Sequence, residues 1–212
     1  MKRIKDVIKE ETKKRIIVAS IRALAHSGEQ GLKIASVARE AGIANGTFYL
    51  YFKNRNNLIE EVLRRISSQL ASCVISVHTY FKQSGSLERA EIEALVQFAE
   101  ENPEEFGVVI DTKLRLNFDE IHPLQLLLEL RRRVIKQGVK NGNISQHLNP
   151  RLAAEADTAM LCACIQAWLK PGATIHKEEL VESLLQMRRS WTAEGQGADD
   201  IDSLLSQWDS RF

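Results

Sequence analysis

Two short helices joined by a glycine turn are predicted between residues 33 and 52, in the segment KIASVAREAGIANGTFYLYF. The first helix shows apolar residues at helical spacing, and Gly42 follows directly after it. Glycine takes a left-handed backbone conformation without steric cost, so it ends the first helix and turns the chain. Ile43 then packs between the two helices. A small core is expected to fix the angle between them, made of Val37, Ala38, Phe48 and Phe52.

The second of these helices, at about residues 45–51, presents its remaining side chains outward. They are Asn45, Thr47, Tyr49, Leu50 and Tyr51. Two exposed tyrosines on a short helix are hard to justify by core packing alone. They suit phosphate and base contacts in the major groove of DNA. The segment therefore predicts a helix-turn-helix motif that binds double-stranded DNA.

The charge of the chain is unevenly distributed. Residues 1–60 carry twelve Lys and Arg against six Asp and Glu, whereas residues 61–212 carry seventeen against twenty-two. A basic beginning joined to an acidic remainder indicates a part that faces nucleic acid, although a basic helix face is often only solvated. The first residues include Lys2, Arg3, Lys5 and Lys9. This arm either contacts DNA phosphates or the minor groove, or it is a solvated extension of the first helix.

The remainder of the chain favours an all-α fold. Strand-like alternation is missing, and the four prolines and eleven glycines fall mostly between helical segments. Helices are expected at about 10–26, 58–81, 123–142, 150–169 and 177–193, with another after Ser86 and a short one in the tail. Asn102-Pro103 and Asn149-Pro150 each predict a cap followed by proline in the first turn of a helix.

The stretch AGIANGTFYLYFKNRNNLIEEVL resembles the signature of the TetR family of transcriptional regulators. That signature is an A-G-(V/I) turn, then G-T-(F/L)-Y-x-(Y/H)-F and a basic residue near the next helix. The resemblance covers about residues 12–63, and GVKNGNISQHLNPRLAAEA is more weakly similar to a later region. It implies a helix-turn-helix DNA-binding domain of three helices over residues 1–57. A larger helical domain for effector binding and dimerisation would follow over 58–195, with a flexible tail at 196–212.

The resemblance also implies roles for single residues of the motif. Asn45, Gly46 and Tyr49 match positions that reach base edges, and an asparagine amide can pair with adenine. Thr47, Tyr51, Lys53 and Arg55 match positions that hold phosphates. The alternatives remain that Thr47 is a local helix cap and Lys53 a solvated turn residue.

The sequence departs from the family at two helix starts. Lys33 and Ala44 stand where the family usually has a capping threonine and serine. We expect Lys33 to donate to a phosphate instead, and base reading to depend on the second helix of the motif. The predicted DNA-binding set is Lys33, Asn45, Gly46, Thr47, Tyr49, Leu50, Tyr51, Lys53 and Arg55.

The resemblance assigns dimerisation to the last two long helices. The helix at 150–169 is rich in alanine, and with the helix at 177–193 it would form a four-helix interface with a second copy. A homodimer sets two DNA-reading helices about 34–36 Å apart, which suits a palindromic operator. A small-molecule effector pocket is predicted from Phe98, Phe106, Ile110, Leu114, Leu127 and Met160. For each of these residues, ordinary core packing is the alternative.

The effector suggested by the sequence is apolar. FAEENPEEF, followed by an apolar helix, resembles the branch of the family that senses fatty-acyl compounds. Arg115, Arg131 and Lys113 either meet an anionic head group or line the surface. The combined expectation is a ligand-responsive repressor. The alternative is a DNA-binding architectural or cell-cycle factor of the same fold, controlled by a protein partner and tightly packed without a cavity.

Other functional classes find little support in the sequence. The five histidines are scattered, and Cys162-x-Cys164 lies in an apolar helical pattern, which favours small core residues over a metal or redox site. We therefore expect no enzyme activity, catalytic residue, metal or cofactor. No apolar stretch reaches the roughly 18–20 residues of a membrane span, and the charged first residues are unlike a signal peptide. A cytoplasmic location follows as the expectation.

Overall fold

The computed structural model describes residues 2–80 and 87–190, and the regular elements in these ranges are all helices. Ser86, residues 191–193 and the predicted tail helix lie outside the described residues. The elements are α1 Lys2–Gly31, α2 Ile34–Glu40, α3 Asn45–Phe48, α4 Arg55–Tyr80, α5 Leu87–Glu101, α6 Pro103–Val109, α7 Thr112–Asn117, the 3-10 turn η1 Asp119–Ile121, α8 Pro123–Lys140, α9 Pro150–Trp168 and α10 Lys177–Ser190. The all-α prediction is confirmed.

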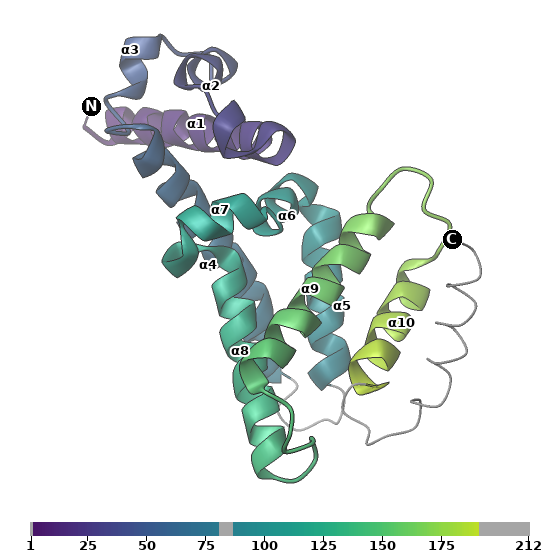
Figure 1. Cartoon of the computed structure of the whole chain (residues 1–212). Helices are drawn as coiled ribbons and strands as arrows, with labels where there is room; N and C mark the ends of the chain where they lie inside the picture. Colours follow the sequence, from purple (N-terminus) through teal and green to yellow (C-terminus); the bar gives the residue numbers. More distant parts are fainter. Residues whose placement is uncertain (1, 81–86, 191–212) are drawn as a thin grey trace, which may run out of the picture.

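Helices α1, α2 and α3 lie together at one end of the molecule, and α4 runs from this end into the remainder (Figure 1). The first helix is longer than predicted at both ends, since it begins at Lys2 and passes beyond Ser27. Gly28 kinks it, with φ 62° and ψ −170°, but the chain resumes one further helical turn. The residues of the basic arm from Lys2 to Lys9 are thus part of α1.

Helix α3 is shorter than predicted, because it ends at Phe48 instead of continuing to residue 51. Tyr49–Tyr51 form a tighter turn in which the Leu50 N–H donates to Thr47 O at 3.1 Å and the Tyr51 N–H to Phe48 O at 2.9 Å. Such bonds between residues three apart are typical of the last turn of a helix.

The other half of the molecule is a bundle of α4, α5, α8, α9 and α10 (Figure 1). Helix α8 packs along α9, and α10 packs against α5. Asn149 caps α9 as predicted, accepting from the N–H groups of Arg151 at 3.0 Å and Leu152 at 3.3 Å. Asn102 precedes α6 but does not cap it, because its side-chain amide donates back to Phe98 O at 3.0 Å. The prediction of that side-chain cap is wrong.

The short helices α6 and α7 lie between the bundle and α1. Helix α6 packs on α1, and a Cβ built on Gly107 would lie 3.3 Å from the Cβ of Ala25, so the two helices approach closely. One core cluster of buried side chains extends from α1, α2 and α3 into α5, α9 and α10. The domain boundary expected at residue 57 falls inside α4 and stays a prediction. None of the helices in the described ranges is long and apolar enough to cross a membrane.

Candidate functional site

The turn between α2 and α3 has the predicted conformation. Gly42 has φ 68°, which only glycine adopts without strain. The Gly42 N–H donates to Arg39 O at 3.1 Å and the Ile43 N–H to Ala38 O at 3.0 Å, so the end of α2 is satisfied by the turn itself. Ile43 is half-buried and packs against the core. The turn thereby holds α3 at a fixed angle to α2.

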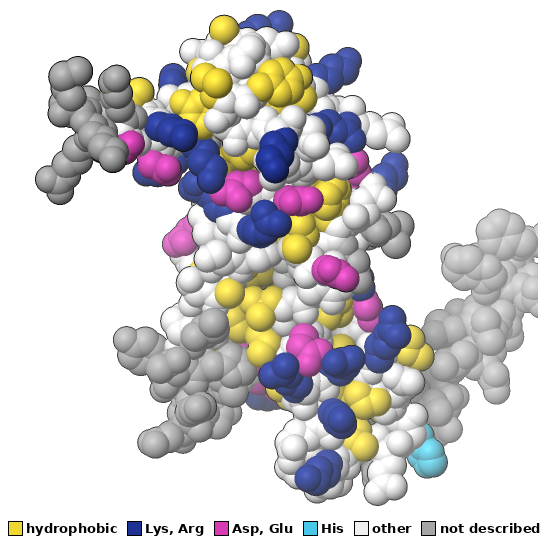
Figure 2. All heavy atoms as spheres, turned by 90° about the vertical axis from the view of Figure 1, so that its left-hand side faces the viewer, with side chains coloured by type: hydrophobic (Ala, Val, Ile, Leu, Met, Phe, Trp, Pro, Cys, Tyr) yellow, Lys and Arg dark blue, Asp and Glu magenta, His cyan; other side chains and the backbone are white. Residues whose placement is uncertain are grey.

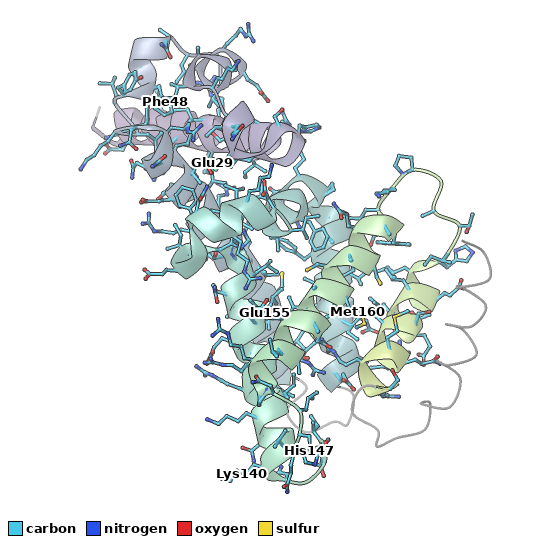
Figure 3. All side chains as sticks on the ribbon, viewed as in Figure 1. Glu29, Phe48, Lys140, His147, Glu155 and Met160 are labelled. Atoms are coloured by element: carbon cyan, nitrogen blue, oxygen red, sulfur yellow. The ribbon has the colours of Figure 1, made fainter. Side chains whose placement is uncertain are left out.

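Phe48 anchors α3 to the hydrophobic core. Its side chain is completely buried, and it points from α3 toward α1 (Figure 3). Phe52 packs against it with ring centroids 5.6 Å apart, and Tyr49 meets it edge-on at 5.3 Å. Val37 and Ala38 are also buried, as predicted. Because Phe48 is fixed in the core by these contacts, the core sets the positions of the neighbouring side chains on the outer surface.

The outer surface of α3 carries the predicted reading residues. Asn45 and Gly46 are exposed, Tyr49 is 54% exposed and Leu50 is 75% exposed. A Cβ built on Gly46 would meet nothing within 4 Å, so the backbone there is open to close approach by a partner. Figure 2 shows exposed hydrophobic side chains at this end of the molecule with Lys and Arg around them. Such a surface suits contact with base edges and phosphates.

Two predicted DNA contacts are less exposed than expected. Thr47 is half-buried, and Tyr51 is half-buried and packs against the core. The shorter α3 accounts for Tyr51, because this residue lies in the tight turn after Phe48 and not on a further turn of α-helix. Both helix starts lack a side-chain cap: Lys33 and Ala44 make no capping hydrogen bond, and Lys33 is exposed.

The basic residues after α3 differ from each other. Lys53 is exposed. Arg55 forms an ion pair with Glu29, with Nη2 2.7 Å from Oε1, and also donates to the Glu29 carbonyl at 3.1 Å. The second Glu29 oxygen accepts from Asn117 Nδ2 at 2.5 Å. Glu29 therefore joins α1, α4 and α7 at the base of the helix-turn-helix (Figure 3), and Arg55 is already engaged there.

The six predicted pocket residues are not gathered around one cavity. Phe98, Phe106 and Leu114 are buried in the core, and Met160 is half-buried against it. Leu127 lines a cavity of about 50 Å³, and Ile110 lines a groove of about 190 Å³ beside α9. Their role as an effector pocket stays a prediction.

A cluster of buried charges lines the smaller cavity, and sequence reasoning missed it as a unit. Asp157 accepts two hydrogen bonds from Arg188, at 3.0 and 2.9 Å, and Arg131 Nε lies 3.1 Å from the same carboxylate. On α5, Glu91 lies 3.4 Å from Arg188 and Glu88 lies 3.9 Å from Arg131. Burial, with the nearby Arg188 charge, lowers the pKa of Arg131. Arg131 thus belongs to the interior, whereas Lys113 is exposed.

The cysteines and histidines that the structure describes form no recognisable site. Within residues 2–80 and 87–190, no group of three His, Cys, Asp or Glu could hold a metal ion. Cys162 is buried, and burial raises the pKa of its thiol to about 12. Cys164 is half-buried and packs against the core. The structure therefore agrees with the interpretation of both as small core residues.

The face of α9 that looks away from the bundle is exposed and apolar. Leu152 is 67% exposed, and it begins a row of exposed alanines, which are Ala156, Ala159, Ala163 and Ala167. On α10, Met187 is exposed. Small side chains at helical spacing allow another helix to approach closely.

Comparisons with known proteins agree with this geometry. Residues 16–62 match the family model of bacterial regulatory proteins, tetR family. The fatty acid metabolism regulator protein of Bacillus subtilis (strain 168) is 21% identical over 187 residues, which is 81% of this chain and 91% of that protein. The segment that the family model matches, residues 16–62, begins in α1 and ends in α4, and it includes all the predicted DNA-binding residues.

Solved structures share the fold. The transcriptional regulator FadR from Bacillus subtilis, in complex with stearoyl-CoA, aligns with TM-score 0.64 and 20% identity over 84% of this chain and 98% of its own. AibR, in complex with isovaleryl coenzyme A and operator DNA, aligns with TM-score 0.69 and 15% identity over 83% of this chain and 97% of its own. At these identities the likeness shows the fold alone.

Proposed function

Because the chain is a TetR-family DNA-binding transcriptional regulator, we propose that it is a homodimeric repressor whose grip on a palindromic operator is released by an acyl-coenzyme A thioester. DNA is its macromolecular target, and its place of action is the cytoplasm. The observation that carries the proposal is the exposed surface of α3 over a rigid core. That it has no enzyme activity stays a prediction.

Base reading is assigned to Asn45 and Tyr49, and phosphate binding to Lys33 and Lys53. Asn45 and Tyr49 are exposed beside open backbone at Gly46, while Phe48 between them is buried. This alternation directs them to the solvent without any cost in core packing. Leu50 offers an apolar contact that suits a thymine methyl group. Thr47, Tyr51 and Arg55 are proposed as weaker contributors, since each is partly held by the protein.

The DNA-reading proposal is tested by selecting bound sequences from a random duplex pool and then measuring affinity by fluorescence anisotropy. Asn45→Ala and Tyr49→Ala should each weaken specific binding by roughly 5- to 150-fold, which corresponds to about 1–3 kcal/mol for a good base contact. Unfolding curves should be unchanged for Asn45→Ala, which is exposed, and shifted by only about 1 kcal/mol for Tyr49→Ala, which loses its edge-on contact with Phe48. Tyr49→Phe separates the hydroxyl from the ring, and Lys140→Ala at the opposite end is the control. Unchanged specific affinity in both alanine variants would contradict the assignment.

Dimerisation is assigned to the exposed apolar row of α9 together with α10. A second copy covering Leu152 and the alanines would remove apolar surface from water and place two reading surfaces one DNA turn apart. Ala156→Arg should shift the protein to monomers in analytical ultracentrifugation and weaken operator binding. Gln137→Arg, on an exposed position of α8, is the charge-matched control. A monomeric wild-type protein would refute the dimer.

The proposal that an effector releases the protein from DNA is supported by the similar structures that contain acyl-coenzyme A. Stearoyl-CoA and isovaleryl-CoA added to the preformed protein–operator complex should lower its anisotropy, while unmodified coenzyme A should act less. Acyl thioesters that leave DNA affinity unchanged would remove this part of the proposal. The second candidate, control by a protein partner, is favoured by one observation: the cavity at Leu127 holds only about 50 Å³, against roughly 300–1,000 Å³ for common ligand pockets.

A further inference from the structure

A groove between α8 and α9 changes from apolar to basic along its length. Its apolar stretch, of about 190 Å³, lies beside Ile110, Leu124, Leu128 and Cys162, and its edge at Ala159 and Ala163 adjoins the row of α9 that the proposed dimer covers. A middle stretch of about 170 Å³ and a basic stretch of about 490 Å³ follow toward the start of α9. The stretches are continuous, since the first two share Leu128 and the last two share Arg132 and Arg151. We call the whole the α8–α9 trough.

The basic stretch has an excess of positive charge. Arg132, Arg133, Lys136 and Arg151 line it together with a single carboxylate, Glu129. Glu129 pairs with Arg132 at 2.5 Å and Arg133 at 2.8 Å, and these cations lower its pKa. Lys136 and Arg151 are exposed and have no ion pair among the described residues. Two cations therefore face solvent uncompensated beside the first turn of α9, whose 19-residue dipole adds positive potential.

This concentration of charge has a signal in the sequence. Between residues 130 and 154 there are six Lys and Arg and no Asp or Glu, although the chain after residue 60 is acidic as a whole. Figure 2 shows Lys and Arg gathered at the lower end of the molecule, and Figure 3 places Lys140 at that end, opposite Phe48 and the reading surface. Operator DNA bound at α3 is therefore remote from these cations.

The middle of the trough is polar. Arg115 on α7 donates to both oxygens of Glu155 on α9, at 2.9 and 2.6 Å, and Gln125 lines the same stretch. Figure 3 shows Glu155 on α9 on the side toward α8. Amide groups of a ligand that crosses this stretch would find both donors and acceptors. The order of chemistry along the trough is thus apolar, hydrogen-bonding, then cationic.

We infer that the α8–α9 trough binds an amphipathic polyanion, with an apolar chain beside Leu128 and Cys162 and phosphate groups at Lys136 and Arg151. This is the chemistry of an acyl-coenzyme A thioester, whose amide-containing arm joins the acyl chain to the phosphates. The inference rests on the proposed function and gives its effector a place in a surface groove, apart from the cavity at Leu127. The complementary charge decides the orientation: the phosphates lie at the start of α9 and the acyl chain lies toward α7.

The test is isothermal titration of the full chain with stearoyl-CoA, isovaleryl-CoA, coenzyme A and stearate. The variant is Lys136→Glu/Arg151→Glu, and the control is Lys140→Glu/Lys170→Glu, which makes the same charge change at exposed lysines outside the trough. The trough variant should bind both thioesters at least tenfold more weakly and bind stearate as the wild type does. The control variant should change affinity by less than twofold. Added salt should weaken the wild type more than the trough variant.

Three results would overturn the inference, and they are distinguishable. Equal thioester affinity in the wild type and the trough variant removes the trough while leaving the acyl-coenzyme A effector standing. If both double variants bind the thioesters equally weakly, the affinity comes from general electrostatic attraction of anions to the basic end of the molecule. Such attraction would apply equally to an anionic membrane surface. A wild type that binds neither thioester removes the effector of the proposed function, and the trough with it. Operator affinity measured in parallel should be the same in both double variants, which shows that they are folded.

Discussion

Asp157 is the residue whose loss should most destabilise the C-terminal bundle without touching the reading surface. Its side chain is 3% exposed and lies between Arg188, at 4%, and Arg131, at 10%. It accepts two hydrogen bonds from Arg188, while Arg131 Nε lies close by without a well-directed hydrogen bond. Asp157→Ala leaves two buried guanidinium groups with only the more distant Glu88 and Glu91 as partners.

The magnitude follows from that burial. Breaking a buried ion pair from one side costs about 3–5 kcal/mol, because an uncompensated charge stays in the interior. Glu88 and Glu91 compensate in part, so we expect a loss near the lower bound, at ~3 kcal/mol. That is a large share of the ~5–15 kcal/mol that stabilises a typical protein. Asp157→Asn should lose nearly as much, since it keeps the shape but removes the charge.

The assay is equilibrium unfolding in guanidinium chloride followed by circular dichroism, at one fixed protein concentration because the proposed dimerisation would add to stability. Asp157→Leu/Arg188→Met is the informative partner variant. Removing both partners leaves no orphaned charge at Arg188, so the double variant should be more stable than Asp157→Ala. A loss below ~1 kcal/mol in Asp157→Ala, the scale of an exposed pair, would refute the reasoning, as would a double variant that loses the sum of the single losses.

Three further predictions concern the turn, the arm and a buried thiol. Gly42→Ala should cost about 1–2 kcal/mol, because φ 68° is strained for an L side chain, while Gly46→Ala, next to open space, should leave unfolding intact and weaken operator binding; equal unfolding curves for both contradict this. Deleting residues 1–9 should flatten the slope of log affinity against log salt by about 0.9 for each phosphate that the arm neutralises in the wild type, and an unchanged slope makes the arm a solvated part of α1. Native Cys162 should react with iodoacetamide at pH 8 roughly 1,000-fold more slowly than a thiol of pKa 9, since its pKa of about 12 leaves little thiolate; labelling at the unfolded rate would contradict its burial.

The helix-turn-helix could be predicted closely because its determinants are local. Gly42 ends α2 through its own backbone preference, and Phe48 and Phe52 lie within one turn of each other, so short-range spacing alone indicates their common core. The length of α3 could not be read in the same way. Whether Tyr51 points outward depends on a tight turn after Phe48, and apolar spacing does not distinguish that turn from one more turn of α-helix.

The effector pocket could not be predicted, because six apolar residues on several helices are equally consistent with a cavity and with a filled core. The structure packs Phe98, Phe106 and Leu114 into the interior and separates Leu127 from Ile110. Apolar character fixes burial but leaves open which buried surfaces face one another. That depends on the packing of helices far apart in the sequence, and no local pattern records it.

Charged residues say more than apolar residues about which distant parts of the chain meet, but only where a charge is buried or lacks a partner. Arg131, Asp157 and Arg188 come from three helices. In the sequence, each of them alone predicts an exposed side chain, and only their pairing explains their burial. Their meeting needed the structure. The cations at Lys136 and Arg151 are the opposite case: they lie in an acid-free stretch of an acidic half of the chain, and neither has an ion pair among the described residues. Arg131, Arg132 and Arg133 of this stretch pair with Asp157 and Glu129, which lie outside it, so Lys136 and Arg151 are the cations at which we expect an anion from outside the chain to bind.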